Sequence, residues 1–132
     1  MEKSKVYFTK EITPESLVRV YEALGINLKG KVAVKLHSGE KGNQNYLRPE
    51  FVKNIIDKVN GTVVECNTAY GGARNETSKH KELMQEHGWC KYFDVDIMDA
   101  EGPDLEIEIP NGIQIKKNIL GKNIKNYDSM LV

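Results

Sequence analysis

The chain has 132 residues, of which 39% are hydrophobic and 29% are charged, a composition typical of a globular domain. Nineteen basic residues balance nineteen acidic ones, and a formal net charge of zero argues against nucleic acid or an anionic membrane surface as a partner. The N-terminus has no apolar signal-peptide core, and no run of about eighteen apolar residues occurs, so we expect a cytoplasmic protein.

The first predicted elements are a short strand at residues 5–8 and the helix that follows it. Thr13 is a suitable N-cap, Pro14 fits the first helical position, and Gly25 can end the helix in a left-handed conformation. An alternating run at residues 31–36 predicts the second strand.

A second helix is expected to begin at Pro49 and to stop at Gly61. Its apolar stripe consists of Phe51, Val52, Ile55, Ile56 and Val59. The β-branched run at residues 62–66 predicts the third strand. A third helix then runs from about residue 77 to residue 87, with Gly88 as its stop.

The last part of the chain is predicted to form strands. We expect one at residues 93–98 and a final one at 127–132. Between them, the alternating runs at 105–109 and 113–117 flank Pro110-Asn111-Gly112, a sequence typical of a hairpin turn.

This order of elements predicts an α/β fold, with a parallel or mixed sheet and flanking helices in a three-layer-like arrangement. The hairpin is either an insertion or an antiparallel edge. We interpret residues 1–132 as a single domain, and the apolar ending predicts a partial or truncated version of a longer domain. An exposed C-terminal edge would favour a homo-oligomer.

Two polar loops follow the second and third strands, which is where open α/β sheets bind ligands. In the first loop, His37 and Glu40 are three residues apart and are candidate acid–base or metal-ligand partners. Gly39 permits close approach of a ligand. A loop that is merely solvated is the alternative.

The second loop, at residues 67–76, opens onto a helix N-terminus, where free amides and the helix dipole favour an anion. Arg74 adds a fork that matches carboxylate or phosphate, unless it only makes a surface ion pair. His80 lies in the first helical turn, which favours a neutral imidazole for catalysis or metal binding. A buried structural histidine is the alternative.

The cysteine count limits the cofactor predictions. Cys66 and Cys90 are too few for a four-thiolate iron–sulfur cluster, so we expect none within this chain. A divalent metal stays open: His37, Cys66 and His80 would converge on one ion if the strand ends are adjacent. Their spacing matches no tight metal motif.

Two stretches carry the most specific patterns of the chain. One is Val-Lys-Leu-His-x-Gly-Glu from Val34, and the other is Asn-Thr-x-Tyr-x-Gly-x-Arg from Asn67. With their flanks they resemble the domain of unknown function 362 family, uncharacterised proteins often joined to ferredoxin-type iron–sulfur modules. The family pattern often has an acidic residue at the position of Cys66, and a His- and Gly-rich segment follows its last strand.

The resemblance and the loops together predict a redox-linked domain that binds a small anionic metabolite or a metal. Catalytic candidates are His37, Glu40 and His80, and ligand-binding candidates are Gly39, Asn67, Thr68, Tyr70, Gly72 and Arg74. The alternative from another class is a non-catalytic binding or assembly module. No reaction or redox partner is predicted, so enzyme activity stays open.

Overall fold

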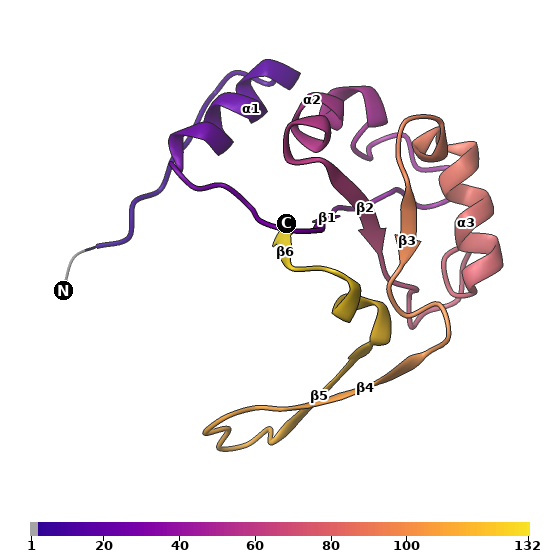
Figure 1. Ribbon diagram of the computed structural model, residues 1–132. Coiled ribbons are helices and arrows are strands. Elements are labelled where there is room, and N and C mark those ends of the chain that lie inside the picture. Colours follow the sequence, from indigo (N-terminus) through magenta and orange to yellow (C-terminus); the bar gives the residue numbers. More distant parts are fainter. Residues whose placement is uncertain (1–2) are drawn as a thin grey trace.

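The main sheet of the protein is parallel and four-stranded, with strand order β3-β2-β1-β6 (Figure 1). The computed structural model describes residues 3–132. The central strands are β1 (Val32–Lys35) and β2 (Gly61–Glu65), and the edge strands are β3 (Val95–Ile97) and β6 (Ser129–Leu131). The predicted α/β class is confirmed, and every pairing in this sheet is parallel.

Local sequence signals set the helix ends. The α-helices are α1 (Pro14–Ala23), α2 (Pro49–Val59) and α3 (Thr77–Glu86). At the start of α1, Thr13 and Ser16 form a reciprocal capping box. The predicted stop of α2 at Gly61 is wrong by one residue, because Asn60 adopts the left-handed conformation (φ 48°) and Gly61 already begins β2.

All three α-helices contribute to the core on one face of the sheet. Tyr21 of α1, Ile56 of α2 and Met84 of α3 belong to the cluster that also holds Val34 and Val63 of the central strands. The opposite face has a smaller cluster, formed by Ala33, Val64 and Met98 and covered by Cys66, Ile124, Tyr127 and Met130. The third layer is therefore thin and centres on the 3-10 helix η2 (Lys122–Asn126).

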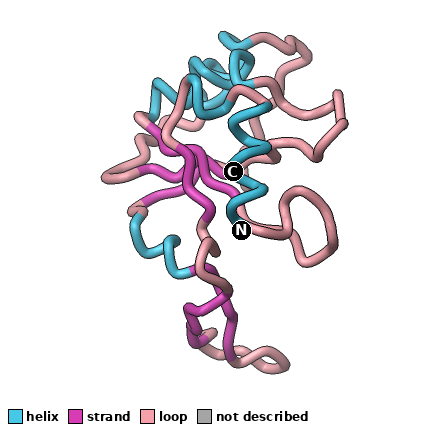
Figure 2. Tube along the Cα trace, turned by 90° about the vertical axis from the view of Figure 1, so that its right-hand side faces the viewer, coloured by secondary structure: helices cyan, strands magenta, loops and turns pink. Residues whose placement is uncertain are grey.

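The hairpin is an insertion that projects away from the main sheet (Figures 1 and 2). Its strands, β4 (Pro103–Glu108) and β5 (Lys117–Gly121), form a separate antiparallel sheet. The turn at Asn111 forms as predicted, with φ 59° and a bond from the Gly112 N–H to the Ile109 carbonyl of 3.0 Å. The second strand was predicted too early, because residues 113–116 extend the loop.

Residues 5–8 are not a strand, and this prediction is wrong. The segment runs as irregular chain away from the sheet (Figure 1). Val6 and Phe8 are 88% and 81% exposed, so their β-propensity has no neighbouring strand to act on. Among residues 3–132, no helix has the length and apolar character needed to cross a membrane.

Candidate functional site

The candidate site lies at the carboxyl edge of β1 and β2. These strands pair in parallel, with Val34 beside Val63 and Lys35 beside Val64, so both following loops leave the sheet at the same edge. Ligands of open α/β sheets bind outside the carboxyl ends of the strands.

Glu65, the last residue of β2, is the centre of a buried polar network. It is 3% exposed and accepts hydrogen bonds from the Ser38 N–H and Ser38 hydroxyl, each 2.9 Å long. Arg74 Nη1 donates to it at 3.0 Å and Lys35 Nζ at 2.9 Å. Burial alone would raise the pKa of Glu65, but the bonds from Ser38 and Lys35 outweigh it and lower that pKa. The carboxyl group is therefore ionised at neutral pH.

Arg74 joins this buried carboxylate to a second one nearer the surface. Its Nε donates to Glu40 Oε1 at 2.8 Å, and its Nη2 donates to the same oxygen at 2.5 Å. The hydroxyl of Tyr70 also donates to Glu40 Oε1, at 2.7 Å. The hydrogen bond from Arg74 lowers the pKa of Glu40, so both carboxylates are ionised around one guanidinium.

A second chain of hydrogen bonds runs from this network through His80. His80 Nδ1 lies 3.2 Å from Asn67 Oδ1, and His80 Nε2 lies 3.5 Å from the Ser38 hydroxyl. Asn67 in turn donates to the hydroxyl of Thr77 at 2.9 Å and, through its backbone N–H, to Asp99 at 2.8 Å. Burial lowers the pKa of His80, which keeps the imidazole neutral.

Ser38, His80 and Asn67 follow the order of a nucleophile, a base and an orienting residue. Two observations argue against that chemistry. The Ser38 hydroxyl is closer to Glu65 (2.9 Å) than to His80 (3.5 Å), so its proton is directed to the carboxylate. Ser38 and His80 are also 1% and 0% exposed, which leaves no path for a substrate. We interpret this trio as structural support for Glu65.

The loop after β1 is fixed by contacts to its backbone. The Ser38 carbonyl accepts hydrogen bonds from Trp89 Nε1 and from His87 Nδ1, each 3.0 Å long. Gly39 adopts φ +100°, and a Cβ there would lie 2.5 Å from the ring of Tyr46. Only glycine fits this position, and the loop is consequently held in the conformation that presents Glu40 to Arg74.

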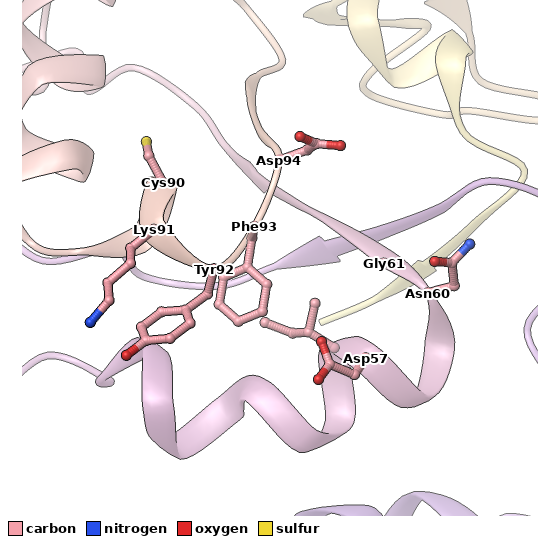
Figure 3. Close-up of a pocket in the computed structure, with 9 residues that line it drawn as sticks. Asp57, Asn60, Gly61, Cys90, Lys91, Tyr92, Phe93 and Asp94 are labelled. Atoms are coloured by element: carbon pink, nitrogen blue, oxygen red, sulfur yellow. The ribbon is translucent and has the colours of Figure 1, made fainter.

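A cleft of about 430 Å³ opens beside the network, between the loops that follow β2 and β3. Its polar lining includes Asn67, Thr68, Asn75, Thr77 and Asp99. A cavity of about 410 Å³ lies at the opposite, amino edge of β2 and β3 and is lined by Asp57, Cys90, Lys91 and Tyr92 (Figure 3). Burial raises the pKa of Cys90, so this thiol is not an activated nucleophile.

The family model of DUF362, a domain of unknown function, matches residues 32–132. This match covers most of the chain and includes both loops of the site. The chain belongs to the DUF362 family. Comparison with curated proteins and with solved structures gives no match. The match confirms the resemblance seen in the sequence. Because neither comparison gives a match, the roles of residues in this DUF362 domain follow from their geometry alone.

The structure brings together some of the predicted site residues and separates others. Glu40, Tyr70 and Arg74 meet directly. Gly72 faces this group, since a Cβ there would lie 3.9 Å from Glu40 Oε2. The Thr68 N–H donates to the Arg74 carbonyl at 2.9 Å and so closes the second loop. Asn67 and His80 contact each other and are linked to Glu65 through Ser38, and His37 is exposed.

Three residues of the network were not among the predicted ones: Lys35, Ser38 and Glu65. The sequence signal for Glu65 is its position at the end of a β-branched strand, where its side chain is expected to be buried. A buried carboxylate requires partners, so this position points to a polar network. The alternative for Arg74 was a surface ion pair. Arg74 does form ion pairs, with Glu40 and Glu65, but the arginine itself is buried, at 5% exposed.

The predicted convergence on a metal ion is also wrong. Within residues 3–132, no three His, Cys, Asp or Glu side chains gather in a way that could hold a metal ion. His37 is exposed whereas His80 is buried, and burial raises the pKa of Cys66 away from the thiolate form that binds metals.

Proposed function

We propose that the carboxyl edge of this DUF362 domain binds a small anionic molecule, with Arg74 as the residue that holds its charge. The observation that carries the proposal is the convergence of two carboxylates on one guanidinium: Glu40 from the loop after β1 and Glu65 from the end of β2. Burying such charges is costly, and apolar residues of similar size would serve stability as well. A fixed guanidinium at the ligand-binding edge of the sheet is instead suited to recognition of an oxyanion.

The remaining groups have separate roles in this proposal. Tyr70, with its hydroxyl 3.2 Å from Arg74 Nη2, adds a donor at the mouth of the site. Exposed His37 and half-buried Glu40 are placed to exchange protons with a ligand or with water. Buried His80 positions Asn67 and Ser38 and does not contact the ligand. A redox link is part of the proposal only through the family's frequent association with iron–sulfur modules.

The test is thermal unfolding in sulfate, phosphate and chloride at matched ionic strength. Specific binding stabilises the folded state, by about 2.7 kcal/mol at one hundred times Kd. We expect sulfate and phosphate to raise the Tm more than chloride in the wild type. Arg74→Lys should lose most of this difference and keep only the general salt effect, while Arg19→Lys, at an exposed arginine paired with Glu11, should keep all of it. The difference between salts is compared within each variant, so a lower starting Tm does not matter.

Equal responses in the wild type and in Arg74→Lys would contradict the proposal. Sulfate and phosphate strengthen burial in any protein through exclusion from its surface, and that general effect does not depend on Arg74.

A second candidate function is assembly, and the hairpin favours it. The hairpin exposes five isoleucines: Ile107, Ile109, Ile113, Ile115 and Ile119. An isolated two-stranded sheet is marginally stable in water, and grouped apolar side chains at a surface mark interaction sites. We propose that a second copy of the chain covers this hairpin.

Sedimentation over a concentration series tests the assembly proposal. The 15.0 kDa chain should form dimers at high concentration. Replacing Ile113 and Ile115, which are 89% and 66% exposed, by serine should weaken association without lowering the Tm at concentrations where the chain is monomeric. A wild type that stays monomeric throughout would exclude assembly through this hairpin.

A further inference from the structure

Glu40 occupies the outward edge of the Arg74 guanidinium. Arg74 Nη1 is turned inward to Glu65, whereas Nε and Nη2 point to Glu40. The Arg74 side chain is 6% exposed and that of Glu40 is 31% exposed. The outward edge of a buried arginine is thus closed by one carboxylate at the surface.

We propose that Glu40 holds the place of the ligand, and that an oxyanion group of the ligand, carboxylate or phosphate, displaces the Glu40 carboxylate from Arg74. The proposal rests on the anion-binding function proposed above and names its chemistry. The displaced side chain moves into solvent, and the ligand takes over the bonds from Arg74 Nε, Arg74 Nη2 and the Tyr70 hydroxyl.

The two carboxylates differ in how firmly they are held. Glu65 uses both of its oxygens: Oε1 accepts from Ser38 and Arg74, and Oε2 accepts from Lys35. Glu40 uses only Oε1, and within residues 3–132 its Oε2 has no hydrogen-bond donor. Three donors share one oxygen, which falls short of the two parallel bonds that a carboxylate can make with a guanidinium. Glu40 is therefore the exchangeable partner.

The surroundings of Glu40 allow it to leave. Gly72 faces Glu40 Oε2 and is exposed, so no side chain covers the carboxylate from that side. Lys41 and Gly42, which follow Glu40, are exposed as well. A rotation of the Glu40 side chain opens the guanidinium edge without moving Ser38 or Gly39, both of which are buried.

This arrangement predicts that Glu40 weakens anion binding in the wild type. When the competent state is a fraction of the population, the apparent Kd rises by the reciprocal of that fraction. The Arg74–Glu40 pair is partly exposed, and a pair of this kind, stabilised by about 0.2–1 kcal/mol, leaves the edge open in about a sixth to two fifths of the molecules. Removing the Glu40 carboxylate should therefore tighten anion binding about twofold to sixfold.

NMR titration of the Arg74 Nε–H signal with acetate and with inorganic phosphate tests the exchange. The chain has three arginines, so Arg74→Lys assigns the signal. Glu40→Ala removes the competing carboxylate, and Glu40→Gln keeps the side-chain volume if the alanine variant does not fold. Glu76→Ala is the matched control, because it removes one exposed negative charge beside the same loop without touching Arg74.

We expect both Glu40 variants to bind at least one of the two anions about twofold to sixfold more tightly than the wild type, and Glu76→Ala to bind like the wild type. The probe that gains more in affinity identifies the oxyanion as carboxylate or phosphate. Equal affinities in the wild type and in the Glu40 variants would overturn the exchange and leave the anion site intact. Equal tightening in Glu76→Ala would reduce the effect to general electrostatics and also overturn it. If no variant binds either anion through Arg74, the anion site itself is wrong.

Discussion

Glu65→Gln is the substitution that most directly tests the buried network. It keeps the shape of the side chain but removes the charge that Arg74 and Lys35 share. Arg74 and Glu65 are 6% and 3% exposed, and removing one partner of such a buried pair costs about 3–5 kcal/mol. With an m value of about 2 kcal/mol/M, the urea midpoint should fall by about 2 M. Circular dichroism follows the unfolding.

A control substitution and the pH dependence of stability complete this test. Glu76→Gln breaks an exposed pair with Lys79 and should change stability by less than about 0.5 kcal/mol. The Glu65 contribution should also depend on pH. Hydrogen bonds hold the pKa of Glu65 below 4.5, so its stabilisation is present above that pH and is lost as the pH falls through the folded-state pKa. A loss in Glu65→Gln as small as that in Glu76→Gln would refute the reasoning.

Other predictions test the histidine, the core and the first loop. His80→Gln should flatten the pH dependence of stability just below pH 6.5, because burial lowers the pKa of His80 and the unfolded chain takes up this proton before the folded chain does; an unchanged slope in urea titrations would contradict this. Ile55→Ala should cost about 2–5 kcal/mol in urea unfolding, against less than about 0.5 kcal/mol for exposed Ile26→Ala, and equal losses would place Ile55 on the wrong helix face. Gly39→Ala, at φ +100°, should lower stability by about 1–3 kcal/mol, whereas Gly71→Ala, with open space around it, should be near neutral.

Local signals were enough to predict most of the fold. Thr13 and Pro14 define the start of α1 because capping and a fixed φ act within a few residues. Residues 5–8 and 113–117 were assigned as strands from their alternation, but a strand also needs a partner. The first segment has none, and the partner of β4 begins at Lys117, where Glu108 finds its pair.

The location of the site could be predicted from the parallel arrangement of the strands. Loops that follow adjacent parallel strands leave at one edge, so the meeting of Glu40 with Arg74 follows from the order of elements. Glu65 was missed because its partners depend on the register between β1 and β2, which no local pattern specifies. Its position after Val63 and Val64, both fully buried, was the available signal. The exposure of His37 depends on the direction of one side chain in a loop, which spacing does not determine.

The contact between Trp89 and the loop after β1 has a consequence for measurement. Trp89 is the single tryptophan of the chain, is fully buried, and donates its indole N–H to the Ser38 carbonyl. Indole emission responds to hydrogen bonding and to water at the ring. The indole fluorescence of the protein therefore comes from one side chain, which is hydrogen-bonded to the residue that also supports Glu65. A rearrangement of that loop can be followed optically without any attached dye.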